Sequence, residues 1–475
     1  MMTKIGKQTK GLCAAFSFAI CQLALTGVLS SCSFEQEDYF PESASLRITH
    51  LNEQLQERLV AQSDTNAQKY GWVIQYFVAG TDDASFEGFN IFGRFYDNGR
   101  ATLASNHRFL RNGNANKYTE HSSFYEMLAE EGPVLSFNTW NDILTVLEDP
   151  VSPSIAPATI SPDGEGMNGD HNLVLTNYSD TSIVFRGERH GAVTRFIPCD
   201  RPWKDYMEAV AKTKSDITSA FITSYYVTNG TDTMYFSGLS RGYFNYCDRV
   251  IDPLSNRVLS CVFTPQGLRL QRPDSLMANT FQEFRIAEDS TCLVSENGDV
   301  RVLACWDNYI VNVRTTVWDF DQDQLSDNQK SLLEQIDAEL KKANKNYSLA
   351  SIGIGRSSGK NAVNGIVVKF YTNTAKSKSN TAGLALNVAK PLFGQMRIAV
   401  AEEPAVDGNM ASISAKNDVA ELVRQFAQSL AGTYNIVPNS YFHPTGCKIQ
   451  EMRLVTENGK EEWKVVEGGA NYILK

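Results

Sequence analysis

The chain has 475 residues, a formal net charge of −10, and 42% hydrophobic and 21% charged residues, which are ordinary globular values. An acidic protein of this kind is a poor candidate for binding nucleic acid or for electrostatic docking on anionic lipid. At about 150 residues for each domain, the length fits two or three domains.

The first 31 residues have the layout of a secretory signal peptide. Three lysines precede a mostly apolar run from Leu12 to Leu29, which is short for a transmembrane span of about 20 residues. The stretch Leu29-Ser30-Ser31-Cys32 resembles the lipobox of bacterial lipoproteins. We therefore predict cleavage before Cys32 and acylation of its sulfur, which would anchor the mature protein, of charge −13, to a membrane.

An acidic tether is predicted over residues 32–42, where Glu35, Glu37 and Asp38 follow the lipid site closely. It resembles the surface-export signal of Bacteroidota lipoproteins, and a solvated spacer that holds a domain off the membrane is the alternative. We expect a lipid-anchored protein of the outer membrane that is exposed at the cell surface.

Residues 43–200 are predicted to form an N-terminal α+β domain. Its elements follow from apolar periodicity, which is helical in some segments and alternating in others. They are, in chain order, a helix over 43–62, a strand over 71–80, a hairpin about Asn98-Gly99, helices over 123–132 and 139–149, and three strands within 171–199.

A second α+β domain is predicted over residues 201–475, with a further division near residue 320. Its elements are a helix over 203–221, strands with turns at Asn229-Gly230, Asp252-Pro253 and Asn297-Gly298, helices over 331–343 and 417–432, and a last hairpin about Asn458-Gly459. Ser326 and Gln329 form a capping box before the helix over 331–343, and Gly432 is the expected C-cap of the later one. The predicted class is α+β with antiparallel, β-rich units, each preceded by an amphipathic helix. A barrel of the lipocalin kind is one arrangement that fits.

The cysteines give no metal or redox motif. Six remain beyond Cys32, and none belongs to a CxxC pair. Cys247 and Cys261 lie equally far from the centre of the turn near Asp252-Pro253, so a hairpin would set them opposite one another. A cross-strand disulfide is then geometrically allowed in an oxidising compartment, and two small buried thiols are the alternative.

Several stretches imitate catalytic motifs without their context. Gly238-Leu239-Ser240-Arg241-Gly242 matches the nucleophile elbow, but the residues after it alternate like a strand where the elbow needs a helix. Gly353 to Lys360 lacks the spacing of a phosphate loop, and we expect a turn there. Asp319 to Asp323 opens like a calcium loop but lacks its glycine and glutamate. No two histidines lie within helical reach, so the sequence predicts no catalytic residue, no metal site and no cofactor.

Trp140 is the candidate for ligand binding. Most tryptophans of the chain lie on apolar faces of predicted elements, whereas Trp140 stands at the start of a predicted helix beside loops. A tryptophan that is not buried in a core offers a flat apolar face and one N–H donor, which suits a sugar ring. The paired carboxylates of a glycosidase have no sequence signature, because their spacing exists only in three dimensions.

Several blocks together resemble a known family. They are the lipobox, ESASLRITHLNEQLQERL followed by GWVIQYF, the block EGPVLSFNTWNDILTVLEDP, and the pieces FTPQGLRL and FQEF. They resemble an uncharacterised lipoprotein family of gut Bacteroidota, domain-of-unknown-function family 4302, over nearly the whole mature chain. Its members are typically encoded beside SusC- and SusD-like outer-membrane uptake proteins, which implies capture of a glycan or peptide nutrient. The family has no established catalytic residues, so the resemblance assigns none to this chain.

The family resemblance and the predicted lipid anchor lead to one leading hypothesis and two alternatives. The leading hypothesis is a ligand-binding or accessory component of a nutrient uptake system, with a glycan or peptide ligand and SusC/SusD-like partners. The first rival is a lipid-anchored extracellular hydrolase with an unrecognised carboxylate site. The second is a structural subunit of a membrane complex. The lack of a catalytic signature favours binding over catalysis.

Overall fold

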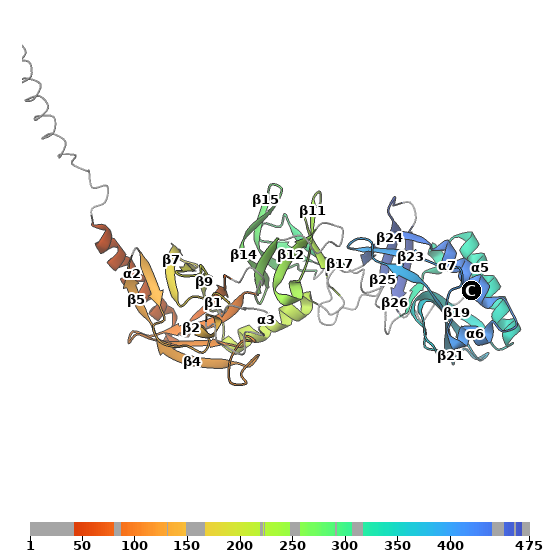
Figure 1. Ribbon diagram of the computed structural model, residues 1–475, viewed down its shortest axis with the longest axis horizontal. Coiled ribbons are helices and arrows are strands. Elements are labelled where there is room, and N and C mark those ends of the chain that lie inside the picture. Colours follow the sequence, from red (N-terminus) through yellow and green to blue (C-terminus); the bar gives the residue numbers. More distant parts are fainter. Residues whose placement is uncertain are drawn as a thin grey trace, which may run out of the picture. The chain divides into compact units, whose positions relative to one another are not determined.

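Three antiparallel sheets follow one another along the chain in the computed structural model (Figure 1). The residues described are 42–79, 87–130, 132–148, 167–218, 222, 224–247, 257–289, 292–305, 317–438, 451–459 and 462–467. Helices precede or cover the sheets, so the α+β class with antiparallel β-rich units is confirmed. The lipid site at Cys32 and the predicted acidic tether up to residue 41 lie outside the described residues. The predicted domain boundaries remain a prediction.

The first sheet contains nine strands in the order β4-β3-β2-β1-β9-β8-β7-β6-β5. Helix α2 (Ala44–Gln62) and the 3₁₀ turn η1 (Thr65–Ala67) precede it. The strands are β1 (Trp72–Phe77), β2 (Phe89–Phe95), β3 (Arg100–Ser105), β4 (Thr119–Phe124), β5 (Glu126–Ala129), β6 (Pro133–Ser136), β7 (Asn172–Tyr178), β8 (Ile183–Gly187) and β9 (Val193–Pro198).

The edge strands β4 and β5 are two halves of one bent strand, because only Tyr125 separates them. The first half pairs with β3 and the second with β6, so the sheet curls toward a barrel that is open at the bend. Tyr125 is buried there against Phe95, with ring centroids 5.0 Å apart, and its hydroxyl donates to the Tyr96 carbonyl. The helix predicted over 123–132 is therefore wrong: pairing on both sides overrides the helical propensity of this stretch.

The predicted helix over 139–149 is also largely wrong. Only Thr145–Leu147 is helical, as the 3₁₀ turn η2. The residues before it form an irregular segment that lies against the open edge of β4, where it satisfies backbone groups that have no strand partner. This segment carries Trp140.

Leucines of α2 close the first core. Leu55 and Leu59 are fully buried with Trp72 and Phe196 in one apolar cluster, and the Trp72 indole N–H donates to the Leu59 carbonyl at 3.1 Å. The apolar periodicity of the sequence therefore identified the correct buried face of this helix.

Helix α3 (Trp203–Ile217) leads into a closed barrel of eight strands, β10 to β17 in sequence order. The strands are β10 (Ser224–Thr228), β11 (Thr233–Ser237), β12 (Tyr243–Cys247), β13 (Val258–Phe263), β14 (Gly267–Leu276), β15 (Asn279–Ile286), β16 (Leu293–Ser295) and β17 (Arg301–Cys305). Phe236 stacks on Phe244 at 3.9 Å and on Tyr225 at 5.5 Å, all three buried. An eight-stranded barrel is just wide enough for side chains to fill it. These aromatic rings occupy its core.

The register of β12 and β13 differs from the one that equal spacing about the turn predicted. Phe244 pairs with Leu259, and the amide of Cys261 donates to the Gly242 carbonyl at 2.8 Å. Cys261 is a free, fully buried thiol, which fits the alternative of small buried thiols. The side chain of Cys247 lies outside the description.

The third sheet repeats the strand order of the first, as β21-β20-β19-β18-β26-β25-β24-β23-β22. Its strands are β18 (Val317–Phe320), β19 (Ser348–Arg356), β20 (Asn364–Tyr371), β21 (Ser379–Ala385), β22 (Asn387–Ala389), β23 (Gln395–Ala399), β24 (Gly432–Pro438), β25 (Glu451–Thr456) and β26 (Glu462–Glu467). Its helical elements are η4 (Gln322–Gln324), α5 (Asp327–Ala343), α6 (Gly408–Ile413) and α7 (Val419–Ser429).

Helix boundaries in this region test the predicted caps. The capping box of Ser326 and Gln329 is present at the start of α5. The predicted C-cap at Gly432 is wrong, because α7 is capped at Leu430 and Gly432 begins β24. The stretch from Gly353 to Lys360 begins inside β19 and turns only after Arg356, so the turn starts later than predicted. In the described part of the chain, no helix is both long and apolar enough to cross a membrane.

His107 is buried in the first core as a neutral ring. One ring nitrogen, Nε2, lies 2.9 Å from the Ile143 carbonyl, and Nδ1 accepts the amide of Phe109 at 3.3 Å. Burial lowers the pKa of His107 to about 4. A proton on Nδ1 would face an N–H group, so the folded state resists protonation.

We predict that acid destabilises the protein through this ring. Since the unfolded chain binds a proton near pH 6.5 and the folded chain near pH 4, the free energy of unfolding should fall by about 3 kcal/mol as pH decreases between these values. Urea unfolding from pH 7.5 to 4 would measure it. His107→Gln should flatten this dependence, whereas His50→Asn, at an exposed histidine, should not. An unchanged slope in His107→Gln would contradict the assignment.

Candidate functional site

The segment that bears Trp140 is fixed to β4 by one buried amide. Asn141 is fully buried, and its Oδ1 accepts the backbone N–H groups of Ile143 at 2.9 Å and Leu144 at 3.4 Å. Its Nδ2 donates to the Ser123 hydroxyl at 2.9 Å and to the His121 carbonyl at 3.4 Å. Asparagine thus replaces the helical backbone bonds that the sequence pattern suggested.

Trp140 projects from this segment with 43% of its surface exposed. Its indole N–H donates to Asp142 Oδ1 at 2.6 Å, and the amide of Asp142 donates to His121 Nδ1 at 2.8 Å. The guanidinium of Arg111 lies 4.8 Å from the ring centroid. A large aromatic side chain is therefore held in one orientation at the surface, where burial in a core does not explain its position.

A hollow of about 370 Å³ opens beside Trp140. Its lining combines an aromatic wall with amide, hydroxyl, carboxylate, imidazole and guanidinium groups. The lining residues are Phe137, Asn138, Thr139, Trp140, Thr145, Glu148, His171 and Arg189. We call this hollow the Trp140 groove.

A histidine hydrogen-bonded to a carboxylate forms one wall of the groove. His171 Nδ1 lies 2.6 Å from Glu148 Oε2, with the carboxylate largely buried. The hydrogen bond with Glu148 raises the pKa of His171 although burial opposes it. The wall thus presents an imidazole ring and a carboxylate of which one oxygen is already engaged.

A buried carboxylate fixes the other wall. Asp170 accepts the backbone N–H groups of Arg189 and His190 at 2.9 Å each and of Ala192 at 3.0 Å. Its own backbone exchanges two hydrogen bonds with the Tyr76 hydroxyl. The loop between β8 and β9 is thereby held so that Arg189 lines the groove. The sequence analysis did not predict this network. The clue in the sequence was Asp170, which follows a glycine but does not precede any predicted helix that it could cap.

The arrangement suits binding better than catalysis or metal chemistry. No group of three or more metal-ligating side chains gathers among the residues that the structure describes. Ser240 lies in the 3₁₀ turn η3 (Leu239–Arg241), which leads into strand β12, so this stretch is a turn as predicted and does not form an elbow. An aromatic platform with several fixed donors and acceptors is the usual composition of a small-molecule site.

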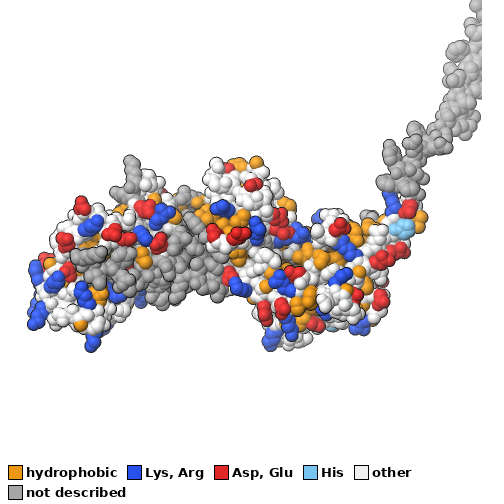
Figure 2. Space-filling view, turned by 180° about the vertical axis from the view of Figure 1, so that it is seen from behind, with side chains coloured by type: hydrophobic (Ala, Val, Ile, Leu, Met, Phe, Trp, Pro, Cys, Tyr) orange, Lys and Arg blue, Asp and Glu red, His pale blue; other side chains and the backbone are white. Residues whose placement is uncertain are grey.

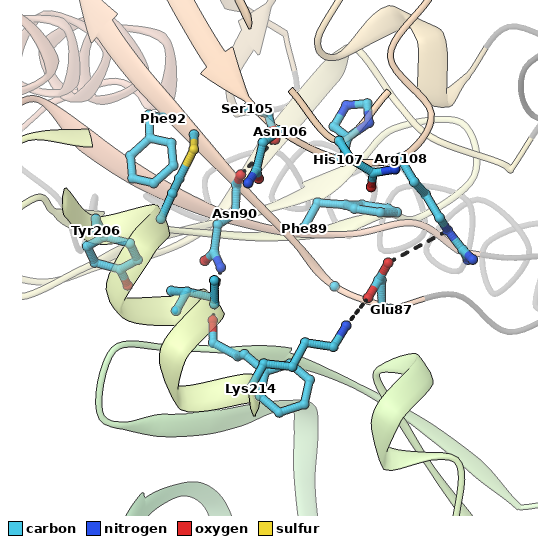
Figure 3. Close-up of a pocket in the computed structure, with 16 residues that line it drawn as sticks. Glu87, Phe89, Asn90, Phe92, Ser105, Asn106, His107, Arg108, Tyr206 and Lys214 are labelled. Atoms are coloured by element: carbon cyan, nitrogen blue, oxygen red, sulfur yellow. Dashed lines mark hydrogen bonds and ion pairs between the residues drawn. The ribbon is translucent and has the colours of Figure 1, made fainter. Parts of the chain in front are cut away.

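A second cavity, of about 210 Å³, lies where the first sheet, α3 and the barrel meet (Figure 3). Glu87 projects into it between Lys214 at 3.3 Å and Arg108 at 3.7 Å. Asn90 donates to the Phe263 carbonyl at 2.9 Å, across the same seam. The charged groups of this cavity pair with one another between the elements that line it. The cavity is therefore better explained as part of the contact between the first sheet, α3 and the barrel than as a ligand site.

The comparisons give the chain a family. The family model described as "Domain of unknown function (DUF4302)" matches residues 36–288, which is more than half of the chain. The chain belongs to this family. The matched region contains the whole Trp140 groove and ends two residues after β15. The family's description assigns the DUF4302 domain no activity.

Other comparisons add nothing to this. No curated protein matches the sequence. The transferrin binding protein B of Neisseria meningitidis is 9% identical with a TM-score of 0.13, covering 83% of this chain and 73% of its own. The DNA polymerase sliding clamp of Pseudomonas aeruginosa is 9% identical with a TM-score of 0.11, covering 87% and 97%. Likenesses this remote carry no argument about fold or function.

We predict that Gly187→Ala disrupts the Arg189 wall. A Cβ at this position would lie 1.9 Å from Asp170 Oδ2, so the carboxylate would lose its three amide bonds. The free energy of unfolding should fall by about 3 kcal/mol, measured by urea denaturation. Gly132→Ala is the matched control, because no described atom lies within 4 Å of a Cβ there, and it should change stability by less than about 0.5 kcal/mol. Equal stability of the two variants would contradict the role of Asp170.

Proposed function

We propose that this DUF4302 protein is a lipid-anchored binding protein of the outer membrane that captures a glycan at the Trp140 groove for a nutrient uptake system. The observation that carries the proposal is Trp140 itself, 43% exposed yet held by a 2.6 Å hydrogen bond beside a polar hollow. An exposed tryptophan with a fixed ring pre-organises a surface for the apolar face of a ligand.

The groove favours a glycan over a peptide. Hydroxyl-rich ligands need donors and acceptors around one flat apolar face, and the groove offers amide, hydroxyl and charged groups beside Trp140. A peptide bound in extended form would need an open strand edge. The outer edge of β4 next to the groove is occupied, because the Phe124 amide donates to the Thr139 hydroxyl and the Asn141 side chain donates to the His121 carbonyl. Peptide capture is the alternative outcome of the binding test.

The proposed cellular location rests on the N-terminal residues. The resemblance of residues 29–32 to a lipobox and the acidic residues after it support a location outside a membrane, and the SusC/SusD-like partners are part of the proposal. On the face shown in Figure 2, basic and acidic side chains are interspersed and do not gather by sign. Such a surface supports a role that does not depend on nucleic acid or anionic lipid.

The groove also favours binding over hydrolysis. Its described lining contains one carboxylate, Glu148, and that group is engaged by His171. A glycosidase needs two carboxyl groups that flank the scissile bond. The hydrolase hypothesis therefore finds no support in this groove.

We predict that Trp140→Ala weakens glycan binding at least about fivefold, because removing a stacked aromatic anchor costs about 1–3 kcal/mol. Glycan arrays and isothermal titration with the oligosaccharides that they identify would measure it. Trp140→Phe should retain part of the affinity. Tyr178→Ala removes an aromatic ring that is 36% exposed in the same sheet but does not line the groove, and it should bind as the parent does. Loss of binding in both variants, or in neither, would contradict the site.

The lipid anchor is tested separately. Cys32→Ala should abolish metabolic labelling by a palmitate analogue and release the protein from the membrane fraction, because no other residue supplies the acylated sulfur. Protease treatment of intact cells should degrade the parent protein if it is exposed at the surface. A labelled Cys32→Ala variant, or a parent protein without lipid, would contradict the anchor.

A further inference from the structure

A second cleft, of about 280 Å³, is lined by residues of the first sheet, of α3 and of the central barrel. Tyr206 lines both this cleft and the cavity of Figure 3. Gln75 and Arg195 line the cleft from neighbouring positions on β1 and β9. Glu283 and Glu296 line it from the barrel.

The barrel side of the cleft is a row of charged residues. Arg269 pairs with Glu283 across β14 and β15. Phe284 pairs with Ser295 in the next ladder, so Glu296 is the following partner of Glu283 just beyond β16. Two carboxylates thus stand on adjacent strands, an arrangement that destabilises a sheet when both are ionised.

Glu283 is the carboxylate that the protein neutralises. Its Oε1 accepts hydrogen bonds from Arg195 Nη1 at 2.5 Å and from Arg269 Nε at 2.8 Å. Burial alone would raise the pKa of Glu283, but the hydrogen bond from Arg269 and the charge of Arg195 hold it below its ordinary value. Glu296 forms no ion pair with a described cation. Burial first, and then the charge of Glu283 and a hydrogen bond with it, raise the pKa of Glu296.

Gln75 supplies an unused acceptor. The side chain is 1% exposed, and its Oε1 has no hydrogen-bond partner among the described residues. A buried carbonyl without a donor costs about 1–3 kcal/mol. Fully buried polar atoms are almost always paired, so an orphan acceptor at the wall of a cleft indicates a ligand or water that donates to it.

The lining carries two guanidinium groups, of Arg195 and Arg285, and two carboxyl groups, of Glu283 and Glu296, so its formal charges balance. Within the described part of the chain, Gln75 Oε1 has no donor, and the hydrogen-bond partner of Glu296 is another carboxyl group. A cation would meet Arg195 and Arg285, and an anion would meet Glu283 and Glu296. A neutral ligand with several hydroxyl groups donates to the acceptors and accepts from the guanidinium groups without adding charge.

We infer that the cleft between Gln75 and the Glu283–Glu296 pair is a second ligand site, which takes one neutral, polyhydroxylated ring of monosaccharide size. The volume of about 280 Å³ is just below the roughly 300 Å³ at which ordinary ligand pockets begin, and so fits a single ring better than a chain. The inference does not rest on the Trp140 groove, which lies on other strands.

The same geometry does not suit glycosidase chemistry. Glu296 and Glu283 share a hydrogen bond, whereas glycosidase carboxyl groups stand about 5 Å or more apart to flank the scissile bond. Glu283 is also bound by two arginines, which weakens it as a base or nucleophile. The carboxyl pair therefore recognises hydroxyl groups and does not cleave a bond.

The test uses the full-length protein in detergent and three neutral probes, D-glucose, D-galactose and N-acetyl-D-glucosamine, with sodium sulfate and methylammonium as charged probes. Saturation-transfer NMR and titration calorimetry would measure binding. At least one neutral sugar should bind the parent protein, and Gln75→Leu should weaken it at least tenfold. This variant should unfold at the same temperature as the parent or higher, because it removes an unpaired acceptor. Glu296→Ala should also weaken binding.

Two control variants show whether the sugar binds at the cleft. Thr194→Val removes a fully buried hydroxyl of the same sheet that has no partner among the described residues and lies outside the cleft lining, so it should leave sugar binding unchanged. In a Trp140→Ala background, which removes the anchor of the Trp140 groove, Gln75→Leu should still weaken monosaccharide binding at least tenfold. The inference is overturned if no neutral sugar binds, if Gln75→Leu binds as the parent does, if only a charged probe binds, or if Trp140→Ala alone abolishes binding.

Discussion

The bend at Tyr125 is the constraint on which the first candidate site depends. A strand that leaves one neighbour for another uncovers backbone N–H and C=O groups, and such groups must find partners or be solvated. Here β4 turns away from β3 and continues as β5 beside β6. The uncovered edge is satisfied by Thr139 and Asn141, which hold the segment between them at the surface. Trp140 is exposed because its neighbours in sequence close the sheet.

The third sheet uses the same solution at the same place in its strand order. Only Leu386 separates β21 from β22, so these strands are also halves of one bent strand. The residues after β23 cover the edge: the Ala405 carbonyl accepts the amide of Ala385 at 2.7 Å, and Asn409 donates to the Thr381 carbonyl at 2.7 Å. If each bent strand is counted once, all three sheets are meanders of eight strands. The repeat belongs to the topology, and the third sheet has no tryptophan in the position equivalent to Trp140.

An element of this protein could be predicted from the sequence when the interactions that stabilise it join residues close together in the chain. Helices α3 and α5 were predictable because an amphipathic stripe and a capping box act within a few residues. The stretch 123–132 is rich in helix-forming residues, yet it forms a bent strand because its partners are 20 or more residues away in β3 and downstream in β6. Trp140 could be singled out because it lies outside any apolar stripe. Gln75 and Glu296 could not be paired, because only the fold brings β1 near the end of β16.

Filled interiors explain why both candidate sites lie outside the central barrel. The side chains of Phe236, Phe244 and their neighbours fill the barrel core, as far as the structure describes it, and leave no room for a ligand. A ligand must therefore bind where neighbouring elements leave a gap between them. One such place is the edge closed by the Trp140 segment, and another is the seam where Arg195 reaches Glu283. At the seam, desolvating two arginines and a carboxylate offsets much of what their attraction contributes, so this ion pair is a weak reason for joining two sheets. The adjacent Glu296 and the unpaired Gln75 make the seam less stable still in the absence of a ligand. A bound ring with several hydroxyl groups would form hydrogen bonds with both Gln75 and Glu296. Apolar packing would stabilise this junction better, so ligand binding gives a physical reason for the polar residues there.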